Sequence, residues 1–198
     1  MSLIETSSEM APGLADAVFD SQRVFRLVLD AMARPGRPVT LDLDLDPPVP
    51  LDPMTAAVCL ALVDFETPLW LDVPGAAADY LHFHCGCPMA ARPAEAVFAV
   101  ITDAAAMPEL GAFSQGSDEA PETSATLLIQ AQGLVEGEGL RLTGPGIENE
   151  ARLRIDGLPA RFMEQWADNH ALFPRGVDAL IVADGRVAGL PRTTRVED

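Results

Sequence analysis

The sequence contains no lysine, so all 13 of its basic residues are arginines. Schiff-base catalysis needs a lysine amine, and ordinary pyridoxal phosphate enzymes hold their cofactor through one. The phosphate-binding lysines of P-loop and kinase sites are excluded for the same reason. We therefore expect no pyridoxal phosphate, and nothing else in the chain predicts another cofactor.

Cysteine and long apolar runs are also scarce. The three cysteines are an odd number and do not suggest a disulfide framework. The longest apolar run, residues 54–63, is too short to cross a bilayer, and the acidic residues 1–20 do not resemble a signal peptide. These features favour a cytoplasmic protein.

Negative charge is abundant, with a formal net charge of −17. A surface of this sign repels nucleic acids and anionic membranes, so we expect neither as a partner. Acidity usually serves solubility, although an acidic face can also dock on a basic protein. The chain of 198 residues is long enough for one domain with a substantial core, and 48% of its residues are apolar.

Metal-binding side chains gather only in LHFHCGCPMA, residues 81–90. Its aromatic residues favour a strand, on which His82 and His84 would share one face while Cys85 and Cys87 lie on the other. Ligands on opposite faces cannot converge on one ion, so we expect no bound metal and interpret the thiols as small buried groups. A metal-binding redox site on His84, Cys85 and Cys87 is an alternative.

Helix and strand patterns interleave along the chain, which predicts an α/β fold: a single domain over residues 1–198, with a mixed sheet flanked by helices and residues 1–13 as a loose tail. Ser21 is a candidate cap for the first helix, and Asp184-Gly185 is a favourable hairpin turn. The predicted helices are 21–33 (Phe25, Val28, Leu29 and Met32 on one face), 52–63, a turn at 76–80, 103–111 and 159–169 (Phe162, Met163 and Trp166 on one face), and the predicted strands are 39–43, 69–73, 81–85, 98–102, 125–132, 140–144, 178–183 and 186–190.

The best candidate for anion binding is PRTTR, residues 191–195. Arg192 and Arg195 can form paired hydrogen bonds with phosphate oxygens, and Thr193 and Thr194 add hydroxyl donors. An exposed tail whose arginines pair with nearby carboxylates is the structural alternative.

Three further segments could contribute to a site. Arg34 lies at the end of the first predicted helix, where a cation can equally serve to stabilise the helix dipole. Gly144 and Gly146 could bring backbone N–H groups close to a ligand, although the spacing is not that of a nucleotide-binding loop and an ordinary turn explains it as well. Asp64 and Glu66 could form an acid–base pair, but a helix end followed by a turn accounts for them too. No serine lies in a nucleophile elbow.

Eight segments, taken in order and with their spacing, carry a resemblance to a known family. They are VFRLVLDAMARPG (24–36), LALVDFETPLWL (60–71), LHFHCGCP (81–88), AVFAV (96–100), SATLLIQ (124–130), LRLTGPGI (140–147), FPRGVDALIV (173–182) and GLPRTTRVE (189–197). Over residues 15–197 the chain resembles PhnH, a family of subunits of the bacterial carbon–phosphorus lyase core complex. LTGPGI, FPRGVD and PRTTRVE make the resemblance specific.

The resemblance implies a fold similar to that of pyridoxal phosphate-dependent transferases, without the cofactor. It also implies a homodimer that associates with the PhnG, PhnI and PhnJ subunits and serves alkylphosphonate degradation. In that pathway PhnG, PhnH, PhnI and PhnL together transfer the ribosyl triphosphate of ATP to a phosphonate, which gives ribose 1-alkylphosphonate 5-triphosphate and free adenine. PhnI is the expected catalyst of this step, PhnJ later cleaves the carbon–phosphorus bond, and the resemblance assigns no catalytic residue to this chain.

Two hypotheses about function follow. The first is a non-catalytic or accessory subunit of the carbon–phosphorus lyase complex. The alternative is a subunit with its own phosphonate- or nucleotide-binding site, built on Arg34, Arg192 and Arg195.

Overall fold

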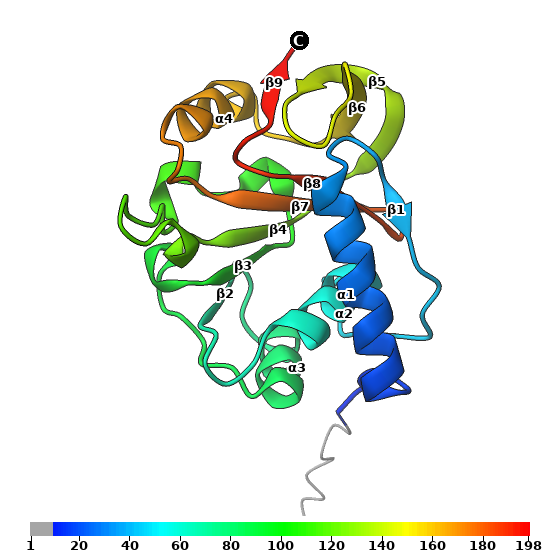
Figure 1. Cartoon of the computed structure of the whole chain (residues 1–198). Helices are drawn as coiled ribbons and strands as arrows, with labels where there is room; N and C mark the ends of the chain where they lie inside the picture. The colour runs from blue at the N-terminus through cyan, green and yellow to red at the C-terminus, as the bar shows by residue number, and fades with distance from the viewer. Residues whose placement is uncertain (1–9) are drawn as a thin grey trace, which may run out of the picture.

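A six-stranded mixed sheet forms the centre of the molecule (Figure 1), in a computed structural model that describes residues 10–198. Its strands are β1 (Val39–Thr40), β2 (Leu69–Leu71), β3 (Phe98–Ile101), β4 (Thr126–Gln130), β7 (Asp178–Ala183) and β8 (Arg186–Leu190). They lie in the order β1-β8-β7-β4-β3-β2. Strands β2, β3, β4 and β7 are parallel, whereas β8 pairs antiparallel with both β7 and β1.

Three α-helices cover one face of this sheet: α1 (Ala17–Ala33), α2 (Pro53–Leu62) and α3 (Ala76–Cys85). Alternate strand residues such as Val100, Leu128 and Leu180 point into the core that these helices close. Asp16 caps α1 and Asp52 caps α2, each through its side-chain oxygen, and Pro53 fits the first turn of α2.

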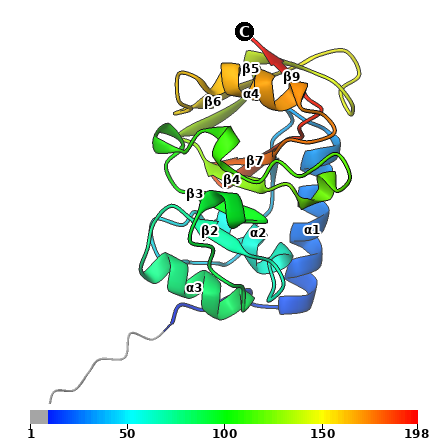
Figure 2. The ribbon, with the colours of Figure 1, turned by 90° about the vertical axis from the view of Figure 1, so that its left-hand side faces the viewer.

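The other face is covered by a second, three-stranded sheet and one helix, which lie at the top of Figure 2. The intervening strand residues, among them Ala99, Leu127 and Ile181, point into the core on this side. The second sheet has the order β6-β5-β9, with β5 bulged between Glu136 and Leu140. The elements are β5 (Gly133–Thr143), β6 (Ala151–Asp156), α4 (Phe162–Ala171) and β9 (Arg195–Glu197), with short 3₁₀ turns at Pro93–Glu95, Ala104–Ala106, Leu110–Ala112 and Pro121–Thr123.

The predicted α/β class, the mixed sheet, the flanking helices and the last hairpin are confirmed. Other predictions were wrong. Residues 81–85 complete α3 instead of forming a strand, because the alanines at 76–78 start a helix that Gly86 ends in the left-handed conformation. Residues 103–111 contain only two 3₁₀ turns, interrupted before Pro108, and the strand predicted at 39–43 ends at Thr40.

Helix α1 begins earlier than predicted, because Asp16 and not Ser21 provides the cap. Strand β5 begins at Gly133 instead of residue 140, and β6 and β9 were not predicted at all. Of the predicted tail, residues 1–9 lie outside the described part of the chain. In the described part, the carbonyl oxygens of Ala11 and Pro12 form hydrogen bonds with His84 and Tyr80 of α3.

Candidate functional site

Arg192 lies on the loop between β8 and β9, and its side chain turns into the protein, where 14% of it is exposed. It forms an ion pair with Asp178, the first residue of β7, whose side chain is 20% exposed. Arg192 Nε donates to both carboxylate oxygens, at 3.2 and 3.1 Å, and the backbone N–H of Arg192 donates to Oδ1 at 2.7 Å. The charge of Arg192 is thus neutralised inside the fold.

The remaining guanidinium donors also have protein partners. Nη1 donates to the carbonyl oxygens of Pro121 and Pro174, at 3.0 and 3.2 Å, and Nη2 donates to Ser124 Oγ and to Asp178. An arginine has five N–H donors, and all five are used here. A phosphate at Arg192 would have to displace some of these partners, so the side chain as placed links three loops to β7.

Thr194 and Arg195 continue the same loop toward α4. Thr194 is fully buried, its carbonyl oxygen accepts a hydrogen bond from Trp166 Nε1 at 2.9 Å, and its hydroxyl has no partner among the described residues. Arg195 Nε donates to His170 Nε2 at 3.3 Å, so His170 Nδ1 carries the proton and donates to the Arg192 carbonyl oxygen at 2.9 Å. Thr193 contributes a carbonyl oxygen that lies against Gly144.

Gly144 and Gly146 lie on the loop between β5 and β6, which is wedged between two other loops. A Cβ atom on Gly146 would lie 2.2 Å from the carbonyl oxygen of Ala33, at the end of α1. A Cβ atom on Gly144 would lie 2.8 Å from the carbonyl oxygen of Thr193. Both have positive φ angles, 137° and 83°, so only glycine fits here without strain. Close packing of backbones explains both residues.

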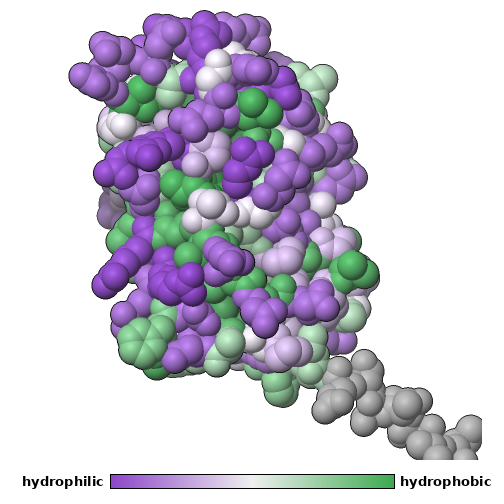
Figure 3. Space-filling model, turned by 90° about the vertical axis from the view of Figure 1, so that its right-hand side faces the viewer, coloured by the Kyte–Doolittle hydropathy of each residue, from purple (hydrophilic) through white to green (hydrophobic). Residues whose placement is uncertain are grey.

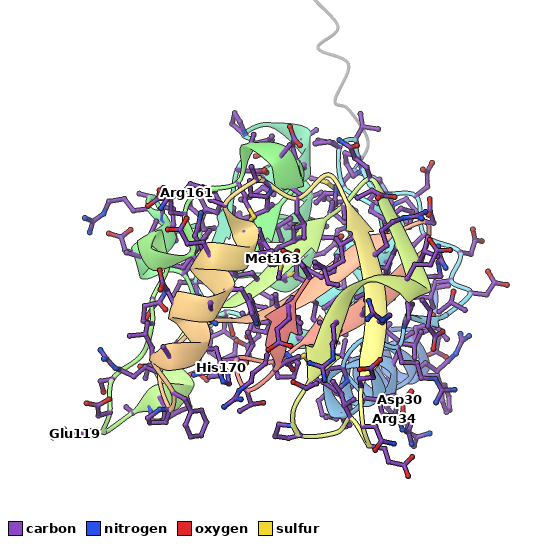
Figure 4. The ribbon with its side chains drawn as sticks, turned by 90° about the horizontal axis from the view of Figure 1, so that it is seen from above. Asp30, Arg34, Glu119, Arg161, Met163 and His170 are labelled. Carbon is purple, nitrogen blue, oxygen red and sulfur yellow. The ribbon has the colours of Figure 1, made fainter. Side chains whose placement is uncertain are left out.

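Arg34 is the residue that ends α1, and its side chain forms an ion pair with Asp30 one turn earlier. Figure 4 shows the two side chains together, on the opposite side of the β5–β6 loop from His170. The structure therefore brings the three predicted loops into contact through their backbones. It does not bring the guanidinium groups of Arg34, Arg192 and Arg195 to one point, and their role in anion binding stays a prediction.

Two open hollows flank this loop region. One, of about 390 Å³, lies beside Arg192 and is lined by Phe173 and by three prolines, Pro121, Pro174 and Pro191, among others. The other, of about 400 Å³, lies between the β5–β6 pair and the start of α4 and is lined by Leu140, Ile155, Phe162 and Met163, among others. Apolar side chains dominate both, and neither contains a nucleophile beside a base.

The cysteine–histidine segment forms the end of α3. Cys85 Sγ donates to the carbonyl oxygen of Cys59 at 3.6 Å, and Cys87 Sγ donates to that of Leu81 at 3.9 Å. The interaction between the two thiols lowers the pKa of Cys87 and raises that of Cys85, and burial raises the pKa of Cys59. His82 and His84 form hydrogen bonds with the carbonyl oxygens of Cys87 and Ala11, at 2.7 and 2.9 Å. No group of three or more His, Cys, Asp or Glu side chains within residues 10–198 is arranged to hold a metal ion.

Comparison with known proteins decides the family. The model of the family described as bacterial phosphonate metabolism protein (PhnH) matches residues 12–197. The chain belongs to the PhnH family. It is 39% identical over 186 residues to the "Alpha-D-ribose 1-methylphosphonate 5-triphosphate synthase subunit PhnH" of Rhizobium meliloti (strain 1021), with 92% of this chain and 93% of the relative covered.

A second relative of the family is the "Putative C-P lyase subunit protein HtxG" of Stutzerimonas stutzeri. It is 33% identical over 184 residues, which cover 88% of this chain and 85% of the relative. No helix within residues 10–198 is both long and apolar enough to cross a membrane.

The loops that carried the sequence resemblance to PhnH are the loops that meet in the structure. RPG follows α1, TGPG joins β5 to β6, and PRTT joins β8 to β9. The aspartate of FPRGVD, Asp178, is the partner of Arg192, and sequence reasoning missed this pair and Ser124. The signal available was that one characteristic segment contains an acidic residue, Asp178, and another contains arginines.

Proposed function

We propose that the chain is an accessory, non-catalytic subunit of a carbon–phosphorus lyase system. It would be required where ATP and an alkylphosphonate are converted to ribose 1-alkylphosphonate 5-triphosphate. The observation that carries the proposal is the 39% identity, over almost the full length of both chains, to a subunit of α-D-ribose 1-methylphosphonate 5-triphosphate synthase. The second relative, a putative C-P lyase subunit, points the same way.

The geometry of the loop region supports an accessory role. Its most enclosed arginine, Arg192, has all five donors bound within the protein, and both neighbouring hollows are lined mainly by apolar side chains. Catalysis of ribosyl transfer would require charged groups aimed at a triphosphate. In the loop region, the charged side chains of Arg192 and Asp178 instead bind each other, and Arg192 also binds other segments of the chain.

The finer features implied by the family resemblance belong to the same proposal. The chain would form a homodimer, associate with PhnG, PhnI and PhnJ, and act in the cytoplasm. Its three-layer fold would be related to that of pyridoxal phosphate-dependent transferases. Because the chain has no lysine, it would do so without an internal aldimine, and purified protein should show no aldimine absorbance.

Growth on a phosphonate tests the role in the cell. Deletion of the gene should abolish growth on methylphosphonate as the sole phosphorus source, and the intact gene should restore it. In a reconstituted reaction with PhnG, PhnI and PhnL, release of adenine from ATP should require this chain, while the chain alone should release none. Release of adenine by the chain alone would contradict the accessory role.

Calorimetry separates the alternative, a ligand site within this subunit. Weak or undetectable binding of ATP and methylphosphonate to the isolated protein is expected. Micromolar binding that is lost in Arg34→Ala or Arg195→Ala would favour the alternative. Both arginines have exposed side chains, so these variants should keep the fold.

A further inference from the structure

Helix α1 has two apolar stripes, and only one of them faces the core. Val24, Leu27, Val28 and Ala31 are buried against the central sheet and α2. A second stripe, about 100° or more around the helix, consists of Val18, Phe25 and Leu29, at positions i, i+7 and i+11.

The second stripe is open to solvent. Val18 is 64% exposed, Phe25 49% and Leu29 53%. The sequence had placed Phe25 and Leu29 with the buried Val28 on one face, and the structure separates them. Large apolar side chains exposed in one line are typical of a surface that binds a partner, whereas single exposed apolar residues are common on any protein.

The surface beside the stripe is concave, because a hollow lies between α1 and α2. It measures about 370 Å³ and is lined by Ser21, Gln22, Phe25 and Arg26 of α1 and by Ala61 of α2. Figure 3 shows the face that carries α1, where hydrophobic side chains are exposed between hydrophilic ones. The segment that follows α2 is also exposed: Asp64, Phe65 and Glu66 all have exposed side chains. A protruding apolar side chain of a partner fits such a hollow better than a flat surface would.

The electric field around the stripe selects the kind of partner. Residues 10–37, which include α1, contain three acidic residues and four arginines, one of which, Arg26, lines the hollow. Residues 38–132, which include α2 and α3, contain 14 acidic residues and one basic residue, Arg92, so residues 10–132 together carry a net charge of −12. Arg92 is itself paired with Glu95. A second copy of this chain, also of net charge −17, would meet like charge at this face. A protein with arginine or lysine side chains around an apolar ridge would meet opposite charge and associate faster.

We propose that the stripe of Val18, Phe25 and Leu29, with the hollow beside Ala61, docks a different protein subunit that presents an apolar ridge bordered by basic residues. This rests on the proposed function, in which the chain acts within an assembly, and it names the surface that joins the assembly. The apolar stripe supplies the contact area, and the acidic segment orients the partner and speeds its approach.

Matched variants of α1 test the surface. Phe25→Glu and Leu29→Glu place a charge in the stripe, and Phe19→Glu places the same charge on the same helix outside the stripe, at a residue that is 67% exposed. None of the three side chains is buried, so all three variants should fold, and circular dichroism checks this. Binding of each protein to PhnG, PhnI and PhnJ, singly and together, is measured by analytical ultracentrifugation at two salt concentrations.

We expect Phe25→Glu and Leu29→Glu to weaken binding about 30-fold, because charge at the centre of a dry contact removes its main contribution. Phe19→Glu should bind as the unaltered chain does. Binding of the unaltered chain should weaken when salt rises from about 0.1 to about 0.5 M, as opposite charges are screened.

Each other outcome overturns a stated part. Equal binding by all three variants would overturn the docking surface and leave the accessory role intact. No binding by the unaltered chain to any of the subunits would overturn the accessory role and the surface with it. If Phe25→Glu instead converted a dimer of this chain to monomers with unchanged subunit binding, the occupant would be a second copy.

Discussion

Between residues 38 and 132 the chain carries 14 acidic residues and one arginine, whereas residues 133–198 carry 11 acidic residues and eight arginines. In the second segment, seven of the eight arginines form ion pairs, and the eighth, Arg195, donates to His170. The first segment leaves most of its carboxylates without an arginine. In the second segment most charged groups are paired, and two of the pairs, Arg161 with Glu109 and Arg175 with Asp118, reach carboxylates of the first segment. Most carboxylates of the first segment stay unpaired and add to the negative field around the molecule.

Most pairs in the second segment are exposed. Arg141 pairs with Glu150 and Glu197, which raises the pKa of Arg141 and lowers that of Glu150. Exposed pairs of this kind contribute little one by one. Substitutions should therefore reduce stability most where the second segment has buried contacts. The predictions below run from the largest expected loss of stability to the smallest.

The largest loss of stability is expected at one of two glycines with similar φ angles. Gly146→Ala should cost about 4 kcal/mol, because its Cβ would lie 2.2 Å from the carbonyl oxygen of Ala33 and because Gly146 itself has a φ of +83°. Gly75→Ala in the first segment has φ +89° and no atom within 4 Å of its Cβ, so it should cost about 1 kcal/mol. Urea unfolding measures both. Equal costs would mean that φ, and not contact with α1, makes Gly146 necessary.

Arg192 and Arg92 give the next comparison. Arg192→Ala should cost about 3 kcal/mol, because it leaves the mostly buried carboxylate of Asp178 without its partner. Arg92→Ala removes an exposed pair with Glu95 and should leave the unfolding midpoint unchanged within scatter. Arg192→Lys keeps the charge but loses the fork of donors, so its stability should lie between the two. A small effect of Arg192→Ala would refute the linking role assigned to this side chain.

A smaller difference in stability is expected between two amide side chains, Asn169 and Gln130, each of which forms two hydrogen bonds with the backbone. Asn169 is 2% exposed; it accepts from the N–H of Val177 at 2.7 Å and donates to the carbonyl oxygen of the same residue at 2.9 Å. Gln130 makes the corresponding pair with Asp52 and Pro50, nearer to solvent. Asn169→Ala should cost about 2 kcal/mol and Gln130→Ala about 1 kcal/mol, since water can replace only the second set of bonds. A reversed order would contradict the difference in burial.

The same contrast explains what the sequence could predict. Strands β3, β4 and β7 are short apolar runs buried on both faces, and α2 has a capping aspartate followed by proline, so each carries its own local signal. Strand β9 carries little local signal, because Arg195–Glu197 becomes a strand only through pairing with the end of β5. Strand β6 did carry a signal: in ARLRID the apolar residues alternate with charged ones, as expected for an edge strand with one face buried.

The loop region could be predicted only in part. The characteristic segments were evident, but their meeting depends on contacts between distant residues, such as Gly146 with Ala33 and Arg192 with Asp178. The prediction of an exposed tail at PRTTR, offered as the alternative to an anion site, missed that Arg192 turns inward. One arginine looks much like another in sequence, and only the fold shows which one has a buried carboxylate beside it.

The smallest expected effect tests the charge of the first segment directly. Asp44 and Glu66 are exposed, and neither side chain forms an ion pair or hydrogen bond among the described residues. In the net field of −17, each is repelled by its neighbours, so the double variant Asp44→Asn, Glu66→Gln should be slightly more stable than the unaltered chain at about 0.02 M salt. Glu150→Gln, by contrast, removes one of the two carboxylate partners of Arg141 and should be slightly less stable. Urea is the denaturant of choice because it leaves ionic strength unchanged.

Raising the salt concentration tests the same charge in the unaltered chain. At about 0.5 M salt both differences between variants should shrink, since repulsion and attraction are screened alike. The unfolding midpoint of the unaltered chain should rise, because unpaired carboxylates outnumber paired ones. A midpoint that falls with salt would mean that the exposed ion pairs of residues 133–198 outweigh the repulsion within residues 38–132.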